Sequence, residues 1–417
     1  MKLLFSHPAG NQNARAMLDG LQREKLLARF ATTLAVSADN PLLKILPEGA
    51  RRDLMRRRFD VPASMIVQHP WREIARAVSN RRGWEFPLRH EVGFASVDRV
   101  LQEFDLFVSR QLASINASER IDAVYCYEDS ALDTFRVAEG IGSLRVYDLP
   151  ISYYATGRKL MKEELERLPA WSIALGGGMS DSPAKLDRKE QELARAELVV
   201  VPSRFVADSL PEWAADKPRV LSPFGSPPSA GTPPAPSDRS RPLRVLFVGS
   251  MGQRKGLADL FAAMQLLKGQ NIELVVMGSR LAPASFYTGQ YPDFIHEGGR
   301  PHAEVLKLMR TCDVFCLPSL YEGRALVMQE AMSQGLPLVI TPNTGGEDLV
   351  IEGKTGFLVP IRSPGLIAEK LAWFEQNREE LHQMKLAAQA HAATYTWARY
   401  ADDVIGAIRE AVEVQPA

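Results

Sequence analysis

Two series of short apolar runs constrain the fold of this chain more than any other feature. Each run is rich in branched aliphatic residues and ends near a glycine, proline or serine. Almost continuously apolar runs are typical of parallel strands that are covered on both faces. Helical patterns separate the runs, which favours right-handed crossovers and doubly wound sheets. The predicted strands occupy residues 2–8, 31–37, 121–128, 143–150 and 196–203 in the first series, and 243–250, 272–279, 312–319, 336–342 and 356–360 in the second.

A stretch rich in proline, serine and glycine, residues 222–242, lies between the two series. This composition cannot support a helix or a central strand, so we predict a linker. The fold class is therefore α/β, with two Rossmann-like doubly wound domains that face a central cleft. We place the N-terminal domain at 1–225, the linker at 226–242 and the C-terminal domain at 243–395. Ligands of such sheets bind at the carboxyl edges of the strands, which here face the cleft.

Charge and cysteine content exclude several classes of protein. The chain has 50 Lys+Arg and 50 Asp+Glu among its 417 residues, so no overall field points to nucleic acid. Three cysteines cannot form a secreted disulfide framework, and we expect Cys126, Cys312 and Cys316 to pack in cores. We find neither a signal-peptide pattern nor the roughly 20 apolar residues of a membrane span. We therefore predict a cytoplasmic protein, at most peripheral at the inner face of the membrane.

A glycine-rich turn, GSMGQRKG at residues 249–256, follows a predicted strand and opens a helix at Leu257. Its glycines let the backbone approach a ligand, and a helix N-terminus offers unpaired N–H groups. Arg254 and Lys255 add positive charge where a diphosphate would lie. An ordinary strand-to-helix turn with solvated basic residues is the alternative, because such turns are common. The residues of this motif that we expect to bind a ligand are Gly249, Ser250, Gly252, Arg254 and Lys255.

Two glutamates, Glu322 and Glu330, lie eight residues apart in the segment 312–360. Glu322 follows a buried strand in a polar turn, whereas Glu330 lies in the apolar helix that comes next. A carboxylate in so apolar a helix must find a hydrogen-bond donor or face a cleft, and the hydroxyls of a ribose would satisfy it. The glycines of TPNTGGEDLV at 341–350 permit a close backbone approach. Together these features predict a ligand cleft.

These motifs resemble, as a set and in order, the nucleotide-sugar domain of a GT-B glycosyltransferase of retaining family 4. The resemblance covers most of residues 243–365 and rests on FVGSMGQRKG, CDVFCLPS, Glu322 and Glu330, EAMSQGLPLV, TGGEDLV and GKTGFLVP. The first half matches more weakly, through HPAGNQN and VPSRFVADSL. The resemblance also implies that a last helix, about 396–417, packs back onto the N-terminal domain, which would bind the acceptor.

The resemblance implies roles for individual residues. Lys255 would contact the donor diphosphate, and Glu330 would accept hydrogen bonds from the ribose. Glu322 would hold the donor sugar together with backbone N–H groups of the residues that follow it. Such enzymes use no metal and no cofactor besides the nucleotide-sugar donor, and we expect a UDP- or GDP-linked donor rather than an ADP-linked one. The other donor-binding candidates are Gly323, Arg324, Ala325, Leu326, Thr344, Gly345 and Gly346.

Two positions depart from the family pattern. Ser250 stands where the family usually has an arginine, and we hypothesise that Arg254 supplies the missing cation. Arg324 stands where an aromatic residue is usual. A cation beside the sugar pocket would indicate an anionic donor sugar or a phosphate contact. The loop Phe294–His302, which would surround the base, carries no readable code for its identity.

Several residues at strand ends of the first domain are acceptor-side candidates. They are equally compatible with structural caps and turns, with Asn13 as the expected helix cap. Tyr127 falls where many members of the family have a histidine, so we assign no catalytic base at this position. The candidates are His7, Gly10, Asn11, Asn13, Tyr127, Glu128, Asp129 and Asp148.

Residues 41–90 are unusually basic. Trp71 and Trp84 lie among these basic residues, a combination that suits an anionic membrane surface or a phosphate-bearing lipid acceptor. A solvated insertion is the alternative. The segment has five acidic residues, against the basic residues Lys44, Arg51, Arg52, Arg56, Arg57, Arg58, Arg72, Arg76, Arg81, Arg82 and Arg89.

We therefore predict a retaining glycosyltransferase that moves a sugar from a nucleotide-diphosphate sugar to a hydroxyl of a saccharide or lipid-linked acceptor, in polysaccharide or glycolipid synthesis. Arg254, Lys255 and Glu322 are its expected catalytic residues. A sugar-nucleotide epimerase and a non-catalytic nucleotide-sugar-binding paralogue are the alternatives. An epimerase would form its product from the donor alone, without an acceptor. A non-catalytic paralogue would bind nucleotide weakly or not at all.

Overall fold

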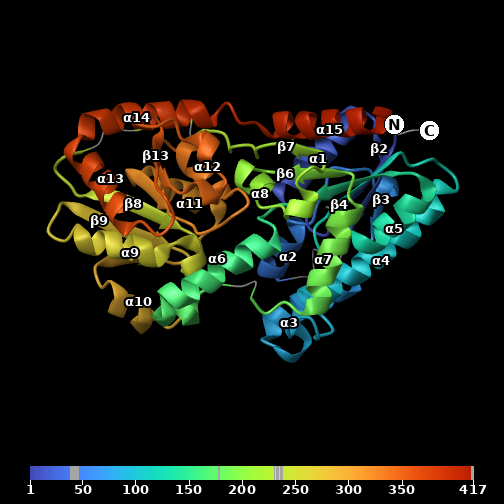
Figure 1. Ribbon diagram of the computed structural model, residues 1–417, viewed down its shortest axis with the longest axis horizontal. Coiled ribbons are helices and arrows are strands. Elements are labelled where there is room, and N and C mark those ends of the chain that lie inside the picture. The colour runs from blue at the N-terminus through green and yellow to red at the C-terminus, as the bar shows by residue number, and fades with distance from the viewer. Residues whose placement is uncertain (38–46, 177–178, 230, 232–233, 235–237, 415–417) are drawn as a thin grey trace.

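The computed structural model describes residues 1–37, 47–176, 179–229, 231, 234 and 238–414. Two parallel sheets form two lobes that lie side by side (Figure 1). Parts of three predictions lie outside the described residues: Lys44 of the basic segment, linker residues 230, 232–233 and 235–237, and the last residues of the final helix, 415–417.

The first sheet has seven strands in the order β3-β2-β1-β4-β5-β6-β7, and all neighbours pair in parallel. Its central strands are almost wholly buried, as the continuous apolar runs predict. The strands are β1 (Leu3–Ser6), β2 (Leu27–Thr32), β3 (Ile66–Gln68), β4 (Ala123–Tyr127), β5 (Leu144–Asp148), β6 (Leu198–Val201) and β7 (Arg219–Leu221).

Helices connect these strands, and side-chain caps fix where several of them begin. Asn11 caps the first helix by accepting a hydrogen bond from the backbone N of Ala14 at 3.1 Å, so the expectation that Asn13 is the cap is wrong. Asn13 is instead buried within that helix. The helices are α1 (Gln12–Arg23), α2 (Glu48–Met55), α3 (Trp71–Arg82), α4 (Val97–Asn116), α5 (Leu132–Ile141), α6 (Tyr154–Arg167), α7 (Pro183–Arg195) and α8 (Arg204–Asp208), with short 3₁₀ turns η2 (Ala63–Met65), η3 (Phe86–Leu88), η4 (Pro169–Ala174) and η5 (Glu212–Ala214).

The second sheet has six strands in the order β10-β9-β8-β11-β12-β13, again all parallel. Its strands are β8 (Leu243–Val248), β9 (Ile272–Met277), β10 (Phe294–Glu297), β11 (Val314–Leu317), β12 (Leu338–Ile340) and β13 (Gly356–Leu358). The remaining helical elements are η6 (Gln253–Lys255), α9 (Leu257–Leu266), α10 (Ala284–Gln290), α11 (His302–Arg310), α12 (Leu326–Ser333), η7 (Pro342–Thr344), η8 (Glu347–Leu349), α13 (Pro364–Gln376), α14 (Arg378–Ala392) and α15 (Trp397–Val414).

The predicted fold class is confirmed. In each sheet the strand order reverses once, between β1 and β4 and between β8 and β11, which are the switch points where doubly wound sheets bind ligands. All ten predicted strands have counterparts, although β2 begins four residues before the predicted 31–37. The short strands β3, β7 and β10 were not predicted, and β10 occupies part of the expected base loop Phe294–His302. Cys126, Cys312 and Cys316 are free and buried, consistent with the predicted packing role.

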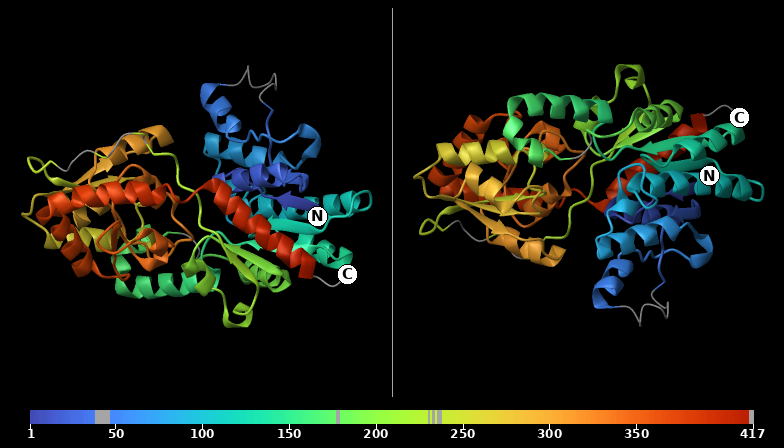
Figure 2. Two further views of the ribbon diagram at one scale, coloured as in Figure 1. Left: turned by 90° about the horizontal axis from the view of Figure 1, so that it is seen from above. Right: turned by 90° about the horizontal axis from the view of Figure 1, so that it is seen from below.

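The chain crosses between the lobes at more than the linker. Helix α15 runs along the first lobe and packs against α1, where Tyr400 and Val404 join the core that also holds Met17 (Figures 1 and 2). Helix α6 reaches in the other direction, towards the second lobe (Figure 1). The turn that follows it, η4, places Trp171 and Ala174 in the core of the second sheet. The domain bounds at 225 and 243 stay a prediction.

A buried ionic network fixes α6 to the second lobe. Glu164 of α6 is fully buried and lies 2.5 Å from Arg167 Nη2 and 2.9 Å from Arg362 Nε. The side-chain amide of Gln253 donates to Glu164 Oε1 at 2.6 Å. Since Gln253 belongs to the glycine-rich turn, this network ties that turn to the first half of the chain.

Candidate active site

The switch point of the second sheet gathers the residues of the glycine-rich turn and the first glutamate. Strand β8 leads into residues 249–252, η6 and α9, and helix α9 begins at Leu257 as predicted. The neighbouring strand β11 leads into the loop that carries Glu322. Gly256 between η6 and α9 has a φ of 73°, and a Cβ there would lie 2.0 Å from the carbonyl oxygen of Pro318. Only glycine therefore allows the two loops to approach this closely.

Glu322 is held between two cations. Its Oε1 lies 2.5 Å from Arg254 Nη1 and 2.7 Å from Lys255 Nζ, and its side chain is 10% exposed. Burial lowers the pKa of the Lys255 ammonium, while Glu322 opposes this shift and Arg254 adds to it. Two cations with one carboxylate leave a net positive charge at the carboxyl edge of the sheet. This is the electrostatic environment that a diphosphate needs.

The loop of Glu322 is joined to the TGG turn that follows β12. The backbone N of Glu322 donates to the Asn343 carbonyl at 2.8 Å, and that of Ala325 donates to the Thr344 carbonyl at 3.3 Å. Gly345 has a φ of 71°, and a Cβ there would lie 1.8 Å from the carbonyl oxygen of Gly323. Gly346 is packed against Met328. The predicted donor-binding segments around Glu322 and Thr344 thus form one structure.

Helix α12 begins directly behind this loop. Ala325 is its N-cap and makes no side-chain capping bond, and Leu326 is its first residue. Glu330 lies on the same helix, with its side chain 18% exposed, and its Oε1 is 3.0 Å from His302 Nε2. His302 begins α11. The predicted need of Glu330 for a partner is thus met in part by this histidine, and the carboxylate keeps lone pairs for further donors.

The expectation that the Arg324 cation lies free beside the sugar pocket is wrong. Its side chain is fully buried and donates to Asp348 through Nη1 at 2.7 Å and Nη2 at 3.0 Å. It also donates to Gln329 at 2.9 Å and to the Gly345 carbonyl at 3.1 Å, and its guanidinium lies over the Tyr395 ring. These bonds use four of the five N–H groups of the guanidinium. Arg324 therefore clamps the loop to the TGG turn, and it gives no evidence for an anionic donor sugar.

Gly252 and Arg254 of the glycine-rich turn lie against η4, the turn that follows α6. A Cβ at Gly252 would lie 3.0 Å from the Ala174 carbonyl oxygen, and the backbone N of Arg254 donates to the Leu175 carbonyl at 3.2 Å. The Ser250 carbonyl accepts a bond from the Gly252 backbone N. Gly249 faces the aliphatic part of Lys255, and a Cβ at Gly249 would lie 3.5–3.6 Å from the side-chain carbons of that lysine.

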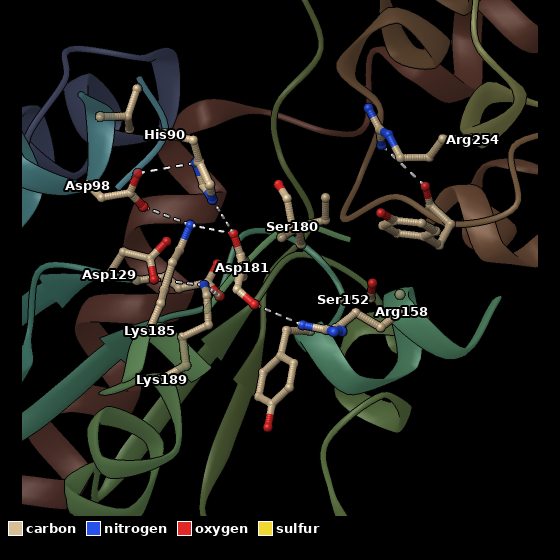
Figure 3. A pocket seen from close by; sticks show the side chains of 16 residues that line it. His90, Asp98, Asp129, Ser152, Arg158, Ser180, Asp181, Lys185, Lys189 and Arg254 are labelled. Atoms are coloured by element: carbon tan, nitrogen blue, oxygen red, sulfur yellow. Dashed lines mark hydrogen bonds and ion pairs between the residues drawn. The ribbon is translucent and has the colours of Figure 1, made fainter. Parts of the chain in front are cut away.

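A cavity of about 570 Å³ opens between the two lobes in front of Arg254 (Figure 3). Arg254 and Tyr321 line it from the second lobe, and Glu128 and Asp129 line it from the first. Two acceptor-side candidates and one predicted catalytic residue therefore share one cavity. Asp129 has a φ of 67°, in the left-handed region that aspartate adopts more often than most other non-glycine residues.

Helix α7 supplies charged residues that sequence reasoning missed. Lys189 Nζ lies 2.6 Å from Glu128 and 2.8 Å from Asp129, and Lys185 Nζ lies 2.8 Å from Asp98 and 3.0 Å from Asp181. The i, i+4 spacing of the two lysines was a readable signal that both lie on one helix face. Ser152 lines the same cavity with a buried hydroxyl that has no hydrogen-bond partner among the described residues, and Arg158 lies beside it in Figure 3.

The remaining acceptor-side candidates lie away from the lining of this cavity. His7 is buried, burial lowers its pKa to about 3, and its ring is 4.6 Å from that of Tyr127. His7 therefore does not face solvent. Asp148 is also buried, and burial raises its pKa to about 7. These groups form a polar layer under the switch point. Gly10 and Asn11 lie in the turn after β1, and Asn13 lies in the first turn of α1.

Among the described residues, one group offers three ligand atoms within 4.8 Å of one another, namely His90, Glu91 and Asp181. The Lys185 ammonium already contacts Asp181 at 3.0 Å, so this group is partly neutralised. In the part of the chain that the structure covers, no helix is long and apolar enough to span a membrane.

Comparison with known proteins agrees with this geometry. Over its whole length the chain resembles the structure of Anabaena Alr3699/HepE in complex with UDP, with a TM-score of 0.60, 14% identity and coverage of 98% of this chain and 100% of the other. The two sheets with their facing switch points therefore define a GT-B fold. Residues 234–391 match the family model "Glycosyl transferases group 1". Over these residues, which include the second sheet, the chain is similar to the glycosyl transferases group 1.

Curated relatives match mainly in part. The amylovoran biosynthesis glycosyltransferase AmsK of Erwinia amylovora is 29% identical over 167 residues, 37% of this chain and 41% of that protein. The D-inositol 3-phosphate glycosyltransferase of Corynebacterium glutamicum is 30% identical over 183 residues, 40% of this chain and 43% of the relative. These matches thus span about two fifths of each relative.

Proposed function

We propose that this protein is a retaining glycosyltransferase that transfers a sugar from a nucleotide-diphosphate sugar to an acceptor hydroxyl. The observation that carries the proposal is the placement of Glu322 between Arg254 and Lys255, at a switch point that opens on a cavity lined by both lobes. A diphosphate requires net positive charge, and a second substrate requires space on the opposite side. Both are present at this one place.

In the proposed reaction the bond between the sugar C1 and the diphosphate oxygen breaks. The acceptor oxygen forms a bond to C1 on the same face, and its proton passes to an oxygen of the leaving phosphate. Lys255 and Arg254 stabilise the negative charge that develops on the departing nucleotide. This mechanism forms no covalent intermediate with the enzyme, so it needs no nucleophilic side chain in the cavity. Burial of the cavity between the lobes limits hydrolysis of the donor.

Glu330 is proposed to accept hydrogen bonds from the ribose hydroxyls, displacing or sharing its contact with His302. Glu322 and the backbone of Gly323 to Leu326 are proposed to hold the donor sugar, with Thr344 to Gly346 beside them. A UDP- or GDP-linked donor is part of the proposal, and the likeness to a UDP-bound structure supports UDP. The polysaccharide role stated for AmsK supports a saccharide or lipid-linked acceptor here.

The proposal is tested by incubating the protein with a panel of nucleotide sugars and saccharide acceptors. Release of nucleoside diphosphate is measured with and without acceptor, and the anomeric configuration of the product is read by NMR. We expect acceptor-dependent release and a retained configuration, both lost in Glu322→Gln and kept in the exposed control Glu369→Gln. A changed sugar formed from donor alone would instead identify an epimerase. Failure to bind any nucleotide would identify a non-catalytic protein.

A further inference from the structure

Apolar side chains gather on one part of the surface, formed by α3 and the loop that follows it. Among the described residues, 19 large apolar side chains are exposed, and eight of them lie between residues 71 and 97. These eight include four of the five exposed tryptophans and phenylalanines, and Phe86 reaches 78% exposure. Such a concentration marks an interaction site. We call it the aromatic surface, and its members are Trp71, Ile74, Val78, Trp84, Phe86, Val92, Phe94 and Val97.

The members of the aromatic surface lie together. Trp71, Ile74 and Val78 follow i, i+3, i+7 spacing and so share one face of α3, which projects at the lower edge of Figure 1. Arg72 joins this helix to the loop, because its guanidinium donates to the Phe94 carbonyl and lies 4.3 Å from the Phe94 ring centroid. The helix face and the loop therefore form one continuous surface.

The loop from 84 to 96 has a defined backbone. The backbone N of Ala95 donates to the Pro87 carbonyl at 2.8 Å, and that of Gly93 donates to the Arg89 carbonyl at 2.7 Å. Ser96 then caps α4. Its aromatic side chains are thus displayed by a closed turn. A merely solvated insertion would carry polar residues at these positions, because exposed aromatic groups gain nothing from water.

The segment that carries the aromatic surface is also basic. Residues 47–97 contain ten arginines and six acidic residues, a net charge of +4. Arg51, Arg82 and Arg89 are exposed and, within the described chain, form no ion pair with a carboxylate. Arg82 lies 5.9 Å from the Trp84 ring centroid. This excess of positive charge beside exposed tryptophans is complementary to the headgroups of an anionic lipid surface.

The same loop and the first turn of α4 also form one wall of the cavity. His90, Val97 and Asp98 line it, and Val97 is a member of the aromatic surface. We propose that the aromatic surface docks on an anionic phospholipid bilayer and brings the cavity to a saccharide carried on a membrane lipid. The proposal that the protein docks on a bilayer depends only on the aromatic surface and its charge. The proposal that the acceptor is carried on a membrane lipid rests on the transferase function proposed above.

Docking is tested by co-sedimentation of the full protein with vesicles. Phosphatidylcholine vesicles containing phosphatidylglycerol are compared with phosphatidylcholine alone, at low and high salt. We expect binding to the anionic vesicles, weakened by salt and by about five-fold for each of Arg51→Ser, Arg82→Ser and Arg89→Ser. The triple variant Trp84→Ser, Phe86→Ser, Phe94→Ser should lose binding at least about ten-fold. Trp213→Ser with Leu266→Ser is the control, since both are exposed elsewhere.

No binding to anionic vesicles at low salt overturns the proposal, as does equal loss in the triple variant and the control. Self-association that the triple variant removes, without vesicle binding, would identify a protein interface instead. Calorimetric binding of nucleoside diphosphate should be unchanged in the triple variant. If wild type binds no nucleotide, the transferase function fails; if it binds nucleotide but not vesicles, only docking fails.

The acceptor part is tested with long-chain alkyl glycosides embedded in the two kinds of vesicle. We expect faster release of nucleoside diphosphate with the anionic vesicles, and the triple variant should remove the difference. Equal rates in both vesicles, including no release in either, overturn the lipid-linked acceptor.

Discussion

The pair of cations at Glu322 gives the sharpest prediction about chemistry. Arg254 and Lys255 both contact the same carboxylate oxygen, at 2.5 and 2.7 Å. Arg254→Ala removes one cation from the proposed diphosphate site but leaves Glu322 paired with Lys255. We therefore expect turnover to fall on the order of a hundred- to a thousand-fold, as for loss of one preorganised donor, while the free energy of unfolding changes little.

The double variant Arg254→Ala, Lys255→Ala should behave differently. It leaves a carboxylate that is 10% exposed without a cation, which costs about 3–5 kcal/mol of stability, far more than the two single variants together. Adding Glu322→Gln should restore stability but not turnover, because the charge that binds the diphosphate is still missing.

Urea unfolding and steady-state release of nucleoside diphosphate measure the two effects separately. Lys307→Ala, on the exposed face of α11, is the control for loss of a basic residue. If Arg254→Ala leaves both donor affinity and turnover unchanged, Arg254 does not replace the arginine that Ser250 displaces. Equal destabilisation by the single and double variants would refute the paired-charge reasoning.

Two further predictions concern stability. Burial raises the pKa of Asp148 to about 7, so the native state holds a proton that the unfolded chain releases near pH 4. The stability that this proton contributes is complete below about pH 4 and is lost as the pH rises through 7. Asp148→Asn should therefore be as stable as wild type near pH 4 and more stable at pH 8, by on the order of 4 kcal/mol at most. A difference in urea unfolding that stays constant with pH would contradict this. Glu164→Gln should destabilise by about 1.5–3 kcal/mol, because it removes the buried carboxylate that Arg167 and Arg362 share, while Arg167 keeps Asp259 and Arg362 keeps Glu163. Glu163→Gln, whose side chain is 40% exposed, should cost less than about 1 kcal/mol, and similar losses in both variants would rule out the network as the cause.

Much of the fold was readable because buried parallel strands need continuous apolar runs. The short strands β3 and β7 could not be predicted, since three-residue edge strands such as Ile66–Gln68 are too short to show a pattern of apolar residues. The placement of Trp171 was equally hidden, because an apolar residue in a helical pattern does not specify which of two cores it joins.

The parts of the candidate site that depend on backbone motifs could be predicted from the sequence. The partners of its long charged side chains could not. The turn at 249–256 and the glutamate positions followed from strand ends and glycines. The side chain of Arg324 turned inward to Asp348, a partner 24 residues away that no local spacing announces. Lys189 reaches Glu128 across 61 residues for the same reason.

The central claim is that a nucleoside diphosphate binds at the switch point of the second sheet with its ribose on Glu330. We would titrate UDP, GDP and ADP into wild type, Glu330→Ala and the exposed control Glu304→Ala by calorimetry. The account predicts one preferred diphosphate, an affinity at least about ten-fold weaker in Glu330→Ala from the lost charged hydrogen bonds, and no change in the control. Binding that Glu330→Ala leaves intact, or no binding of any nucleotide, would contradict it.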